Sequence, residues 1–495
     1  MKYTLGIDLG SSSIKVAIIN VKDGIAVASS KYPETEMEIQ APQPSWAEQS
    51  PEFWWSCTLK AIEQACNKSK IKSNQIGAIG ISYQMHGLVT LDLEGKVNRP
   101  SIIWCDSRAT DIGSKASQQL TKSERASLLN SYGNFTASKL AWVKENEPEL
   151  YEAIDQVLLP GDYLAYRFSG IPQTTIGGLS EGVFWDFEKR ERSKVTSRIF
   201  DFQSSLFPEI VPTIGFQCKV SSEAADVTGI PVGTPITYRA GDQPNNALSL
   251  GVFENGDVAA TGGTSGVVYA VTDQLIFDPT ERINAFAHVN YSAEQQRIGL
   301  LMCINGTGIQ YAWLRKLLAP NSSYEELEQK ALSTPIGAKG LIALPFGNGA
   351  ERIFQNQSVG AHINGIDFNR HGSEDLLRAG LEGIAFTFQY GLQCLTNMGC
   401  RFKSLKVGND NLFQSTIFSK TLATLSGCEI EVYDTTGAEG AARAAAVGAG
   451  ITENMEYYQP YLEKVKVYEP DNTWEKVRDI YSNWENQLRK QVQID

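Results

Sequence analysis

The chain has 495 residues, more than one hydrophobic core usually serves, so we expect at least two domains. Its 42% hydrophobic and 20% charged residues are typical of a globular protein in water, and a net charge of −12 argues against a nucleic-acid partner. No apolar stretch is long enough to span a membrane, and no hydrophobic leader precedes the first apolar segment. We therefore expect a cytoplasmic protein without a membrane partner.

Cysteine and histidine content narrows the possible chemistry. The eight cysteines show none of the close spacings of a zinc site, and we expect them to be reduced and mostly buried. Only four histidines occur, which excludes a histidine-rich metal centre. Acid–base chemistry in this protein must then fall mainly to carboxylates.

Near the start of the chain, a turn of small residues joins two predicted strands. Residues 4–19, TLGIDLGSSSIKVAII, consist of two apolar segments separated by Gly10 and three serines. Glycine lets the backbone approach a phosphate closely, and small hydroxyls add hydrogen-bond donors without bulk. The turn suits phosphate binding, although an ordinary hairpin tip has the same composition.

Residues 76–87 predict a buried strand that ends in polar side chains. The apolar stretch IGAIGISY is followed by Gln84, Met85 and His86. Such strand ends carry ligand contacts in α/β proteins. For His86, a histidine that is hydrogen-bonded within the core remains the alternative.

Residues 102–108, IIWCDSR, predict a second strand with a polar end. Trp104 lies close to Asp106 in the sequence. This pair suits a sugar, because an aromatic side chain can contact the sugar and a carboxylate can bind its hydroxyls. A local salt bridge between Asp106 and Arg108 is the alternative.

Asp242 is an unusual acid, placed near the middle of the chain in AGDQPNNALSLG (residues 240–251). Its only cationic neighbour in the sequence is Arg239. An aspartate before a proline and an apolar run is typical of a turn or a helix cap. A catalytic carboxylate between two halves of the protein is the other interpretation.

Residues 257–271, DVAATGGTSGVVYAV, repeat the order of strand, small-residue turn and strand about half a chain after the first hairpin. One such hairpin is a weak signal. Two of them, one in each half, predict paired domains that close on a shared polyphosphate.

Residues 435–449, TTGAEGAARAAAVGA, predict a turn followed by a helix of very small residues. Such a helix packs closely against a neighbouring element, or it leaves room for a flat ligand. Both interpretations stay open at this point.

Together these segments resemble the FGGY family of carbohydrate kinases, and the likeness covers nearly the whole chain. GIDLGSSSIK (6–15) is similar to the family's first phosphate motif, and residues 360–386 follow its C-terminal signature. QMHG is the form found in members that phosphorylate xylulose, whereas AGDQ is shared with those that phosphorylate glycerol. Further likeness is found at residues 46–55, 139–146 and 158–170.

The resemblance implies a two-domain α/β protein with the actin-like, ribonuclease H-like ATPase fold and a cleft between the domains. Residues 1–244 would form the domain with the sugar site, the first phosphate hairpin and the catalytic aspartate. Residues 245–495 would carry the second phosphate hairpin and the adenosine site. ATP and Mg²⁺ are the implied cofactors, a small sugar is the implied partner, and a homodimer is compatible with the family.

The resemblance also implies a role for each matching residue. Asp242 corresponds to the base that takes the proton from the sugar hydroxyl, and Asp8 to the acid that holds Mg²⁺. The implied sugar-binding residues are Met85, His86, Asp242 and Gln243, with Trp104 and Asp106 beside them. The implied nucleotide-binding residues are Gly10, Ser11, Ser12, Ser13, Lys15, Gly263, Thr264, Gly308, Gly408 and Asn411.

One segment departs from the family pattern. Family members usually have glycines and an alanine beneath the adenosine, whereas residues 407–413, VGNDNLF, retain only Gly408. The nucleotide preference is therefore open. The expected reaction is ATP-dependent phosphorylation of a ketose, with D-xylulose to D-xylulose 5-phosphate as the leading choice. Gluconate, L-ribulose and glycerol are alternative substrates, and a non-catalytic regulator that binds ATP or sugar is the remaining alternative.

Overall fold

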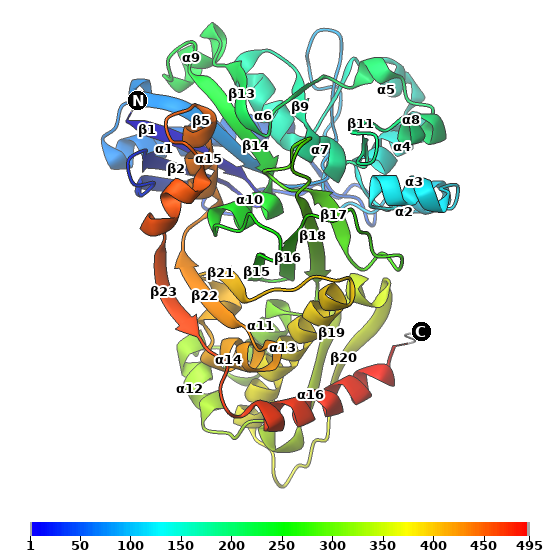
Figure 1. Cartoon of the computed structure of the whole chain (residues 1–495), viewed down its shortest axis with the longest axis vertical. Coiled ribbons are helices and arrows are strands. Elements are labelled where there is room, and N and C mark those ends of the chain that lie inside the picture. Colours follow the sequence, from blue (N-terminus) through cyan, green and yellow to red (C-terminus); the bar gives the residue numbers. More distant parts are fainter. Residues whose placement is uncertain (1, 493–495) are drawn as a thin grey trace.

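The first predicted hairpin lies in the middle of a six-stranded sheet, which forms the upper half of the molecule in Figure 1. The computed structural model describes residues 2–492. Strands β1, β5 and β14 run parallel, whereas β2, β3 and β13 pair antiparallel with their neighbours. The strands, in sheet order, are β13 (Ile214–Lys219), β14 (Pro235–Gly241), β5 (Ile76–Tyr83), β1 (Tyr3–Leu9), β2 (Ile14–Asn20) and β3 (Ala26–Tyr32).

The second predicted hairpin lies within a seven-stranded sheet in the lower half of the molecule (Figure 1). Strands β15, β21 and β22 run parallel, and the other strands pair antiparallel. In sheet order they are β17 (Asn284–Ala287), β18 (Ile298–Ile304), β16 (Gly266–Thr272), β15 (Val258–Gly262), β21 (Ser404–Gly408), β22 (Glu429–Asp434) and β23 (Glu463–Tyr468).

The two sheets share one topology. The order β13-β14-β5-β1-β2-β3 corresponds to β23-β22-β21-β15-β16-β18, with the same parallel and antiparallel pairings throughout. The second sheet adds only β17 at its edge. The likeness between the two hairpins in the sequence is therefore one part of a repeat that covers both halves.

Helices cover both faces of the first sheet, which explains why its central strands are apolar on both sides. Helix α1 (Pro51–Ser69) packs on β2 and β3, and α15 (Gly437–Gly448) packs on the opposite face across β1 and β5. A Cβ atom added to Gly6 would lie 1.8 Å from the carbonyl oxygen of Ala438, and one on Gly80 would lie 2.0 Å from that of Ala441. The helix backbone thus rests directly on the strands, so the structure supports close packing for the small residues of 435–449.

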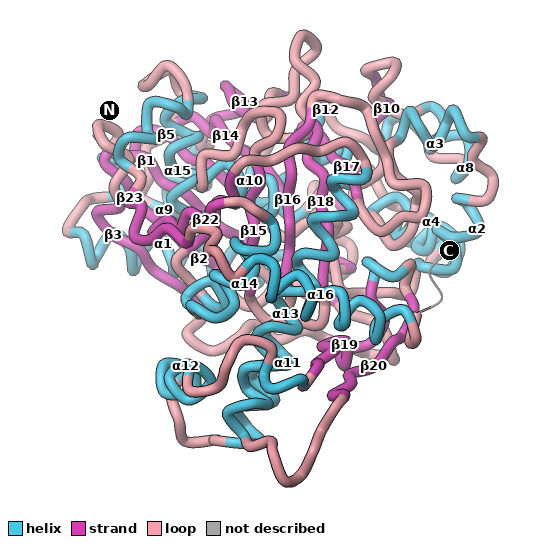
Figure 2. Tube along the Cα trace, turned by 60° about the horizontal axis from the view of Figure 1, so that its bottom comes forward, coloured by secondary structure: helices cyan, strands magenta, loops and turns pink. Residues whose placement is uncertain are grey.

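Three long helices accompany the second sheet: α13 (Ser373–Asn397), α14 (Thr416–Ser426) and α16 (Trp474–Arg489). Figure 2 shows them on one side of the molecule, in front of the strands of that sheet. Helices α13 and α14 pack against each other and against strands of the sheet, and α16 packs on α14 and on the hairpin of β19 and β20. This layer holds the core of the second half.

The segment between β5 and β13 forms the upper right part of the molecule in Figure 1. Its helices and strands are β6 (Val89–Leu91), β7 (Ser101–Ile102), α2 (Thr110–Ser117), α3 (Lys122–Leu128), α4 (Thr136–Asn146), α5 (Pro148–Glu152), β8 (Gln156–Leu158), α6 (Pro160–Ser169), β9 (Gln173–Thr175), α7 (Ile176–Glu181), β10 (Trp185–Asp186), β11 (Glu191–Arg192), α8 (Lys194–Phe200) and β12 (Glu209–Val211). The other helices and strands of the chain are β4 (Glu48–Gln49), α9 (Ser222–Thr228), α10 (Asp242–Ser249), α11 (Gly308–Leu318), α12 (Tyr324–Leu332), β19 (Ile342–Glu351) and β20 (Gln357–Asn364).

The predicted boundary between residues 244 and 245 falls inside α10, which lies between the two sheets in Figure 1. Helix α15 lies between β22 and β23 of the second sheet in the chain but packs on the first sheet, so the two halves are interlocked. Within residues 2–492, no helix has both the length and the apolar character needed to span a membrane.

Candidate active site

Three parallel strands of the first sheet bring their carboxyl ends together, and the predicted metal-binding acid and the predicted catalytic acid lie there. Asp8 near the end of β1 is paired in register with Ser82 of β5, which is paired in turn with Ala240 of β14. The Ser82 hydroxyl donates a hydrogen bond to Asp8 Oδ1 at 3.0 Å. Asp242 follows the end of β14 directly. The edge of a parallel sheet where strands end is the usual ligand position in α/β proteins.

Asp242 is the first residue of α10, and it does not cap that helix. The N-cap is Gly241, and no side chain caps the end. Burial raises the pKa of Asp242 to about 7, and the charge of Asp8 adds to the rise, against hydrogen bonds from Gln243 and the charge of Lys15. A carboxylate with a pKa near neutrality is suited to accept and release a proton at physiological pH.

Lys15 links the first hairpin to the second half of the protein. It is paired in register with Asp8 across the hairpin, and its side chain is exposed. The same ammonium group lowers the pKa of Asp242 and that of Asp410, although burial raises the pKa of Asp410 above its usual value. Lys15 of the first hairpin therefore acts electrostatically on an acid of the second half, in the segment that follows β21.

The tip of the first hairpin is closed by a backbone bond from Gly10 N–H to the Ser13 carbonyl, at 3.1 Å. Ser12 is exposed at this tip, and Ser11 is half-buried. Trp104 Nε1 donates to Ser11 Oγ at 3.4 Å, and 52% of the Trp104 surface is exposed. The structure thus places Trp104 against the predicted phosphate turn.

The tip of the second hairpin is held by the start of α11. Gly308 N–H donates to the Gly263 carbonyl at 3.2 Å, and Thr307 Oγ1 donates to the Thr264 carbonyl at 3.0 Å. A Cβ on Gly308 would lie 2.2 Å from the Gly263 oxygen, so only glycine fits there. The Thr264 side chain remains exposed at the tip.

The atypical segment 407–413 lies beside this second hairpin. Gly408 ends β21, the parallel neighbour of β15. Asn411 has a left-handed backbone with φ of 52°, and its amide nitrogen lies 3.9 Å from the position that a Cβ on Gly263 would occupy. Gly308, Gly408 and Asn411 are therefore gathered around one hairpin, as the resemblance implies.

His86 sits at the end of β5 in a left-handed backbone conformation, with φ of 61°, which is unusual for a residue with a side chain. Its Nδ1–H donates to the Glu181 carbonyl at 3.0 Å, which leaves Nε2 as an acceptor. Burial first, and the charge of Lys139 second, lower the His86 pKa to about 3. The ring is neutral at pH 7, and Nε2 has no hydrogen-bond partner within residues 2–492.

Met85 precedes His86 in the chain, and Gln243 follows Asp242. Met85 is buried and lines a cavity of about 10 Å³ together with Gly241, which leaves room for about one water molecule. Gln243 is the second residue of α10 and is half-buried. Both follow strand ends at the same edge of the first sheet as Asp242.

The strand predicted at residues 102–108 is shorter in the structure, where β7 ends at Ile102. Asp106 is fully buried beyond it, where it accepts the backbone N–H of Ala47 at 2.6 Å and pairs with Arg108 at 2.7 Å. Arg108 also pairs with Glu48 at 2.7 Å. The structure therefore shows the local salt bridge that the sequence left open for this pair.

Sequence reasoning missed Glu181, the last residue of α7. Its side chain is buried, Oε1 has no hydrogen-bond partner in the part of the chain described, and Oε2 lies 2.7 Å from where a Cβ on Gly241 would be. Burial, with Asp242 and then Asp162 as further causes, raises the Glu181 pKa well above its usual value. Glu181 is thus a buried acid behind Asp242 whose charged form is disfavoured, and no motif of the sequence signals it.

Two further residues support the site, although the sequence predicts no role for either of them. Lys139 is buried, and its ammonium donates to the carbonyls of His86 at 2.8 Å and Ile103 at 2.9 Å. Burial lowers its pKa to about 7. Asn245 of α10 is buried and donates to the Gly437 carbonyl at 2.9 Å, which ties the start of α15 to the helix of Asp242.

The described residues contain no cluster of three or more side chains that would hold a metal ion by themselves. Mg²⁺ does not require such a cluster, because it keeps several waters and binds through one or two carboxylates plus substrate phosphates. Asp8, next to the first phosphate turn and near Asp242, fits that mode.

Known proteins match this chain over nearly its full length. Residues 3–249 match the FGGY family of carbohydrate kinases, N-terminal domain, and residues 258–449 match the C-terminal domain of that family. The xylulose kinase of Bacillus subtilis is 27% identical over 500 residues, which cover 98% of this chain and 96% of that protein.

Solved structures share the fold. The xylulose kinase of Rhodospirillum rubrum has a TM-score of 0.88 at 24% identity and covers 99% of both chains. The ADP complex of Plasmodium falciparum glycerol kinase also has a TM-score of 0.88, at 20% identity, and covers 100% of this chain and 99% of that one. These likenesses confirm the predicted two-domain actin-like α/β fold. Together with the two domain matches, they show that the chain belongs to the FGGY family of carbohydrate kinases.

Proposed function

We propose that this kinase transfers the γ-phosphoryl group of ATP to D-xylulose and forms D-xylulose 5-phosphate. The observation that carries the proposal is Asp242, a carboxylate whose pKa is raised to about 7 where three parallel strands end, beside Asp8. A pKa in this range is unusual for an aspartate, and such shifts cluster at functional sites.

Asp242 acts as the general base of the reaction. Its carboxylate takes the proton from the sugar hydroxyl while the hydroxyl oxygen forms a bond to the γ-phosphorus. The bond between the γ-phosphorus and the β,γ-bridging oxygen breaks, and ADP leaves. Phosphoryl transfer needs positioning and charge neutralisation more than covalent chemistry, so one base suffices.

The two hairpins position the triphosphate. Their tips offer backbone N–H groups and the hydroxyls of Ser12 and Thr264, and Lys15 adds a positive charge on the first hairpin. Mg²⁺, when bound, neutralises charge on the phosphate oxygens, and Asp8 would hold it. Gly308 and Asn411, next to the second hairpin, support placement of the nucleotide in the second half.

His86 supports a sugar as the acceptor. With Nδ1–H committed to the Glu181 carbonyl and the ring neutral, Nε2 accepts a hydrogen bond from a sugar hydroxyl. D-xylulose is the preferred candidate because of the QMHG segment and the xylulose kinases that the chain resembles over nearly its full length. Gluconate, L-ribulose and glycerol are the competing substrates within the same family, and a non-catalytic regulator is the competing role.

A coupled assay of ADP release tests the proposal. It compares D-xylulose, L-ribulose, gluconate and glycerol at equal concentrations with MgATP, with a control that lacks sugar to measure ATP hydrolysis alone. We expect kcat/KM for D-xylulose to exceed the others by about tenfold or more, the discrimination typical of a site that pairs its buried polar groups with the substrate. Higher kcat/KM with another sugar would transfer the assignment to that sugar. No sugar-dependent ADP release in a broader panel of ketoses, polyols and sugar acids would favour a regulator.

A further inference from the structure

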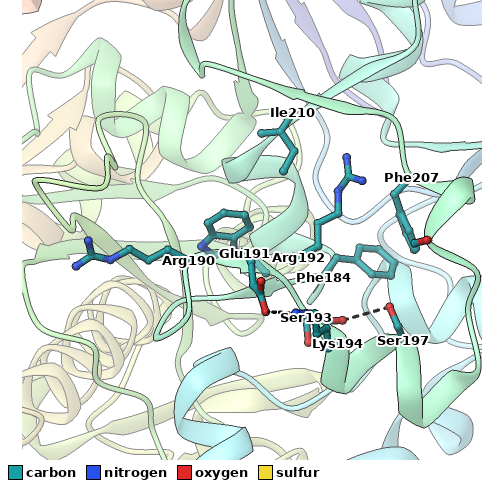
Figure 3. A pocket seen from close by; sticks show the side chains of 11 residues that line it. Phe184, Arg190, Glu191, Arg192, Ser193, Lys194, Ser197, Phe207 and Ile210 are labelled. Carbon is teal, nitrogen blue, oxygen red and sulfur yellow. Dashed lines mark hydrogen bonds and ion pairs between the residues drawn. The ribbon is translucent and has the colours of Figure 1, made fainter.

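A cavity of about 500 Å³ lies outside the site described above, in the segment between β5 and β13. This volume is in the range of small-molecule binding sites. Its apolar lining comes from Phe184, Trp185, Phe207 and Ile210, on β10, β12 and the loops next to them (Figure 3). Phe184 and Phe207 pack against each other, with ring centres 4.7 Å apart. The cavity thus offers flat apolar walls.

The same cavity contains a guanidinium group without an ionic partner. Arg192, the second residue of β11, points between Ile210 and Phe207 in Figure 3. Its Nη2 donates to the Pro208 carbonyl, and its Nε is buried without a hydrogen-bond partner. No ion pair within residues 2–492 involves Arg192. Leaving a buried donor unpaired costs free energy, and the cost is larger when the group is charged.

The arginines that are fully buried in this protein have carboxylate partners. Arg99 pairs with Glu48 at 2.7 Å and with Glu147 at 3.0 Å, and these charges raise its pKa against the effect of burial. For Arg192, burial lowers the pKa and no carboxylate opposes it. Arg192 is half-buried and, within residues 2–492, has no carboxylate partner of the kind that these arginines have.

The other charged side chains around the cavity either form an ion pair or point away from Arg192. Lys194 pairs with Glu191 at 2.9 Å. Arg190 extends away from Arg192 and Phe207 in Figure 3, and its guanidinium lies 3.1 Å from the side-chain oxygen of Gln296 when that amide is turned to accept. Arg192 is therefore the cation available to a ligand inside the cavity.

We propose that this cavity binds a small organic anion, with the oxyanion on Arg192 and a flat apolar body between Phe184, Phe207 and Ile210. A guanidinium group matches a carboxylate in geometry, and the bond is charge-assisted. The ligand class is a carboxylate on an aromatic or short aliphatic body. This site is separate from the sugar and nucleotide site and does not depend on the identity of the sugar.

Benzoate is the probe, and neutral benzyl alcohol of similar size is its control. Binding is measured by titration calorimetry with saturating MgADP present, so that the nucleotide site is occupied. We expect benzoate to bind about tenfold or more tightly than benzyl alcohol, since the loss of a charge-assisted hydrogen bond costs at least that much. Equal affinity for the two probes, or no measurable binding of benzoate, overturns the proposal.

Matched variants locate the site. Arg192→Met keeps an unbranched apolar side chain without the charge and should weaken benzoate binding about tenfold or more, whereas Arg190→Met should change it less than about twofold. Equal affinity in wild type and Arg192→Met refutes the assignment. If Arg192→Met does not fold, Ser197→Phe, which fills the cavity from α8, decides: it should abolish binding, and retained binding overturns the proposal. Sugar kinase activity without benzoate should stay at the wild-type level in all three variants, which separates this test from that of the proposed function.

Discussion

Asp242→Asn should abolish turnover and at the same time stabilise the protein at alkaline pH. The amide keeps the shape of the carboxyl group but cannot accept the proton from a sugar hydroxyl. A positioned base contributes about 10²–10⁴-fold to a rate, so kcat should fall by at least that range. The gain in stability follows from the cost of holding a carboxylate where burial and Asp8 disfavour its charge.

The size of this gain can be worked out from the pKa shift. The pKa of Asp242 rises from 3.8 to about 7 on folding, and each pKa unit corresponds to about 1.4 kcal/mol. The carboxyl group therefore contributes no penalty below its unfolded pKa of 3.8. The penalty grows as pH rises and reaches about 4 kcal/mol above pH 7. Asparagine avoids this penalty, but it loses about 0.3–1 kcal/mol of favourable interaction between an acid and the start of α10. The net gain in the free energy of unfolding at pH 8 is therefore at most about 3 kcal/mol, because water reaches the half-buried carboxylate and reduces the penalty on its charge.

Thermal unfolding at two pH values is the measurement. Without ligands or Mg²⁺, the variant should unfold several degrees above wild type at pH 8, at about 2–4 °C per kcal/mol for a domain of this size. The two proteins should unfold at nearly the same temperature close to pH 4. A lower unfolding temperature for the variant at pH 8, or an equal difference at both pH values, would show that Asp242 is not held against its charge.

Three other substitutions test the site. His86→Ala should raise KM for the sugar about 10- to 100-fold, because a buried hydrogen-bond partner is lost, and KM for ATP should stay the same; unchanged sugar kinetics would mean a purely structural histidine. Asp8→Asn should raise the Mg²⁺ concentration for half-maximal activity about tenfold or more, and wild-type Mg²⁺ dependence would contradict the metal assignment. Removing this negative charge should also shift the acidic limb of any residual activity to lower pH, since Asp8 raises the pKa of Asp242. Glu181→Gln should keep kcat/KM at pH 7 within about threefold, because burial and Asp242 disfavour the charge of Glu181 and the amide keeps its shape and hydrogen bonding, and a loss above tenfold would show that Glu181 acts as an anion.

The parts of the site that sequence reasoning located are those in which local pattern and chemistry coincide. Asp8 lies near the end of an apolar strand and Asp242 directly follows one, and the small-residue turns mark where the backbone reverses. The strand that precedes His86 ends where the pattern predicted. Such positions depend on local propensity, which a sequence displays directly.

The other parts depend on contacts between distant segments. Glu181 matters because the end of α7 lies against Gly241, and neither segment signals the other. Gly6 and Gly80 are required by a helix that begins more than 350 residues later in the chain. Asp106 has the residue type of a ligand contact, but its neighbours Arg108 and Ala47 use its whole carboxylate. Sequence patterns suggest residue types for a function, and only the fold decides which partners they meet.

The repeat also explains how the two hairpins divide the chemistry. Leu9 and Ile14 close the first turn, and the next pair along the ladder is Asp8 with Lys15. In the second hairpin Gly262 and Gly266 close the turn, and the corresponding pair is Thr261 with Val267. The corresponding pair of positions therefore carries two opposite charges in the first half and none in the second. In the proposed reaction, metal binding and charge neutralisation would then belong to the first hairpin, and the second would contribute backbone donors and the Thr264 hydroxyl. In the proposed reaction, the duplicated turn thus provides two binding turns for one polyphosphate. The ionic groups lie in the half that carries Asp242 and the proposed sugar site.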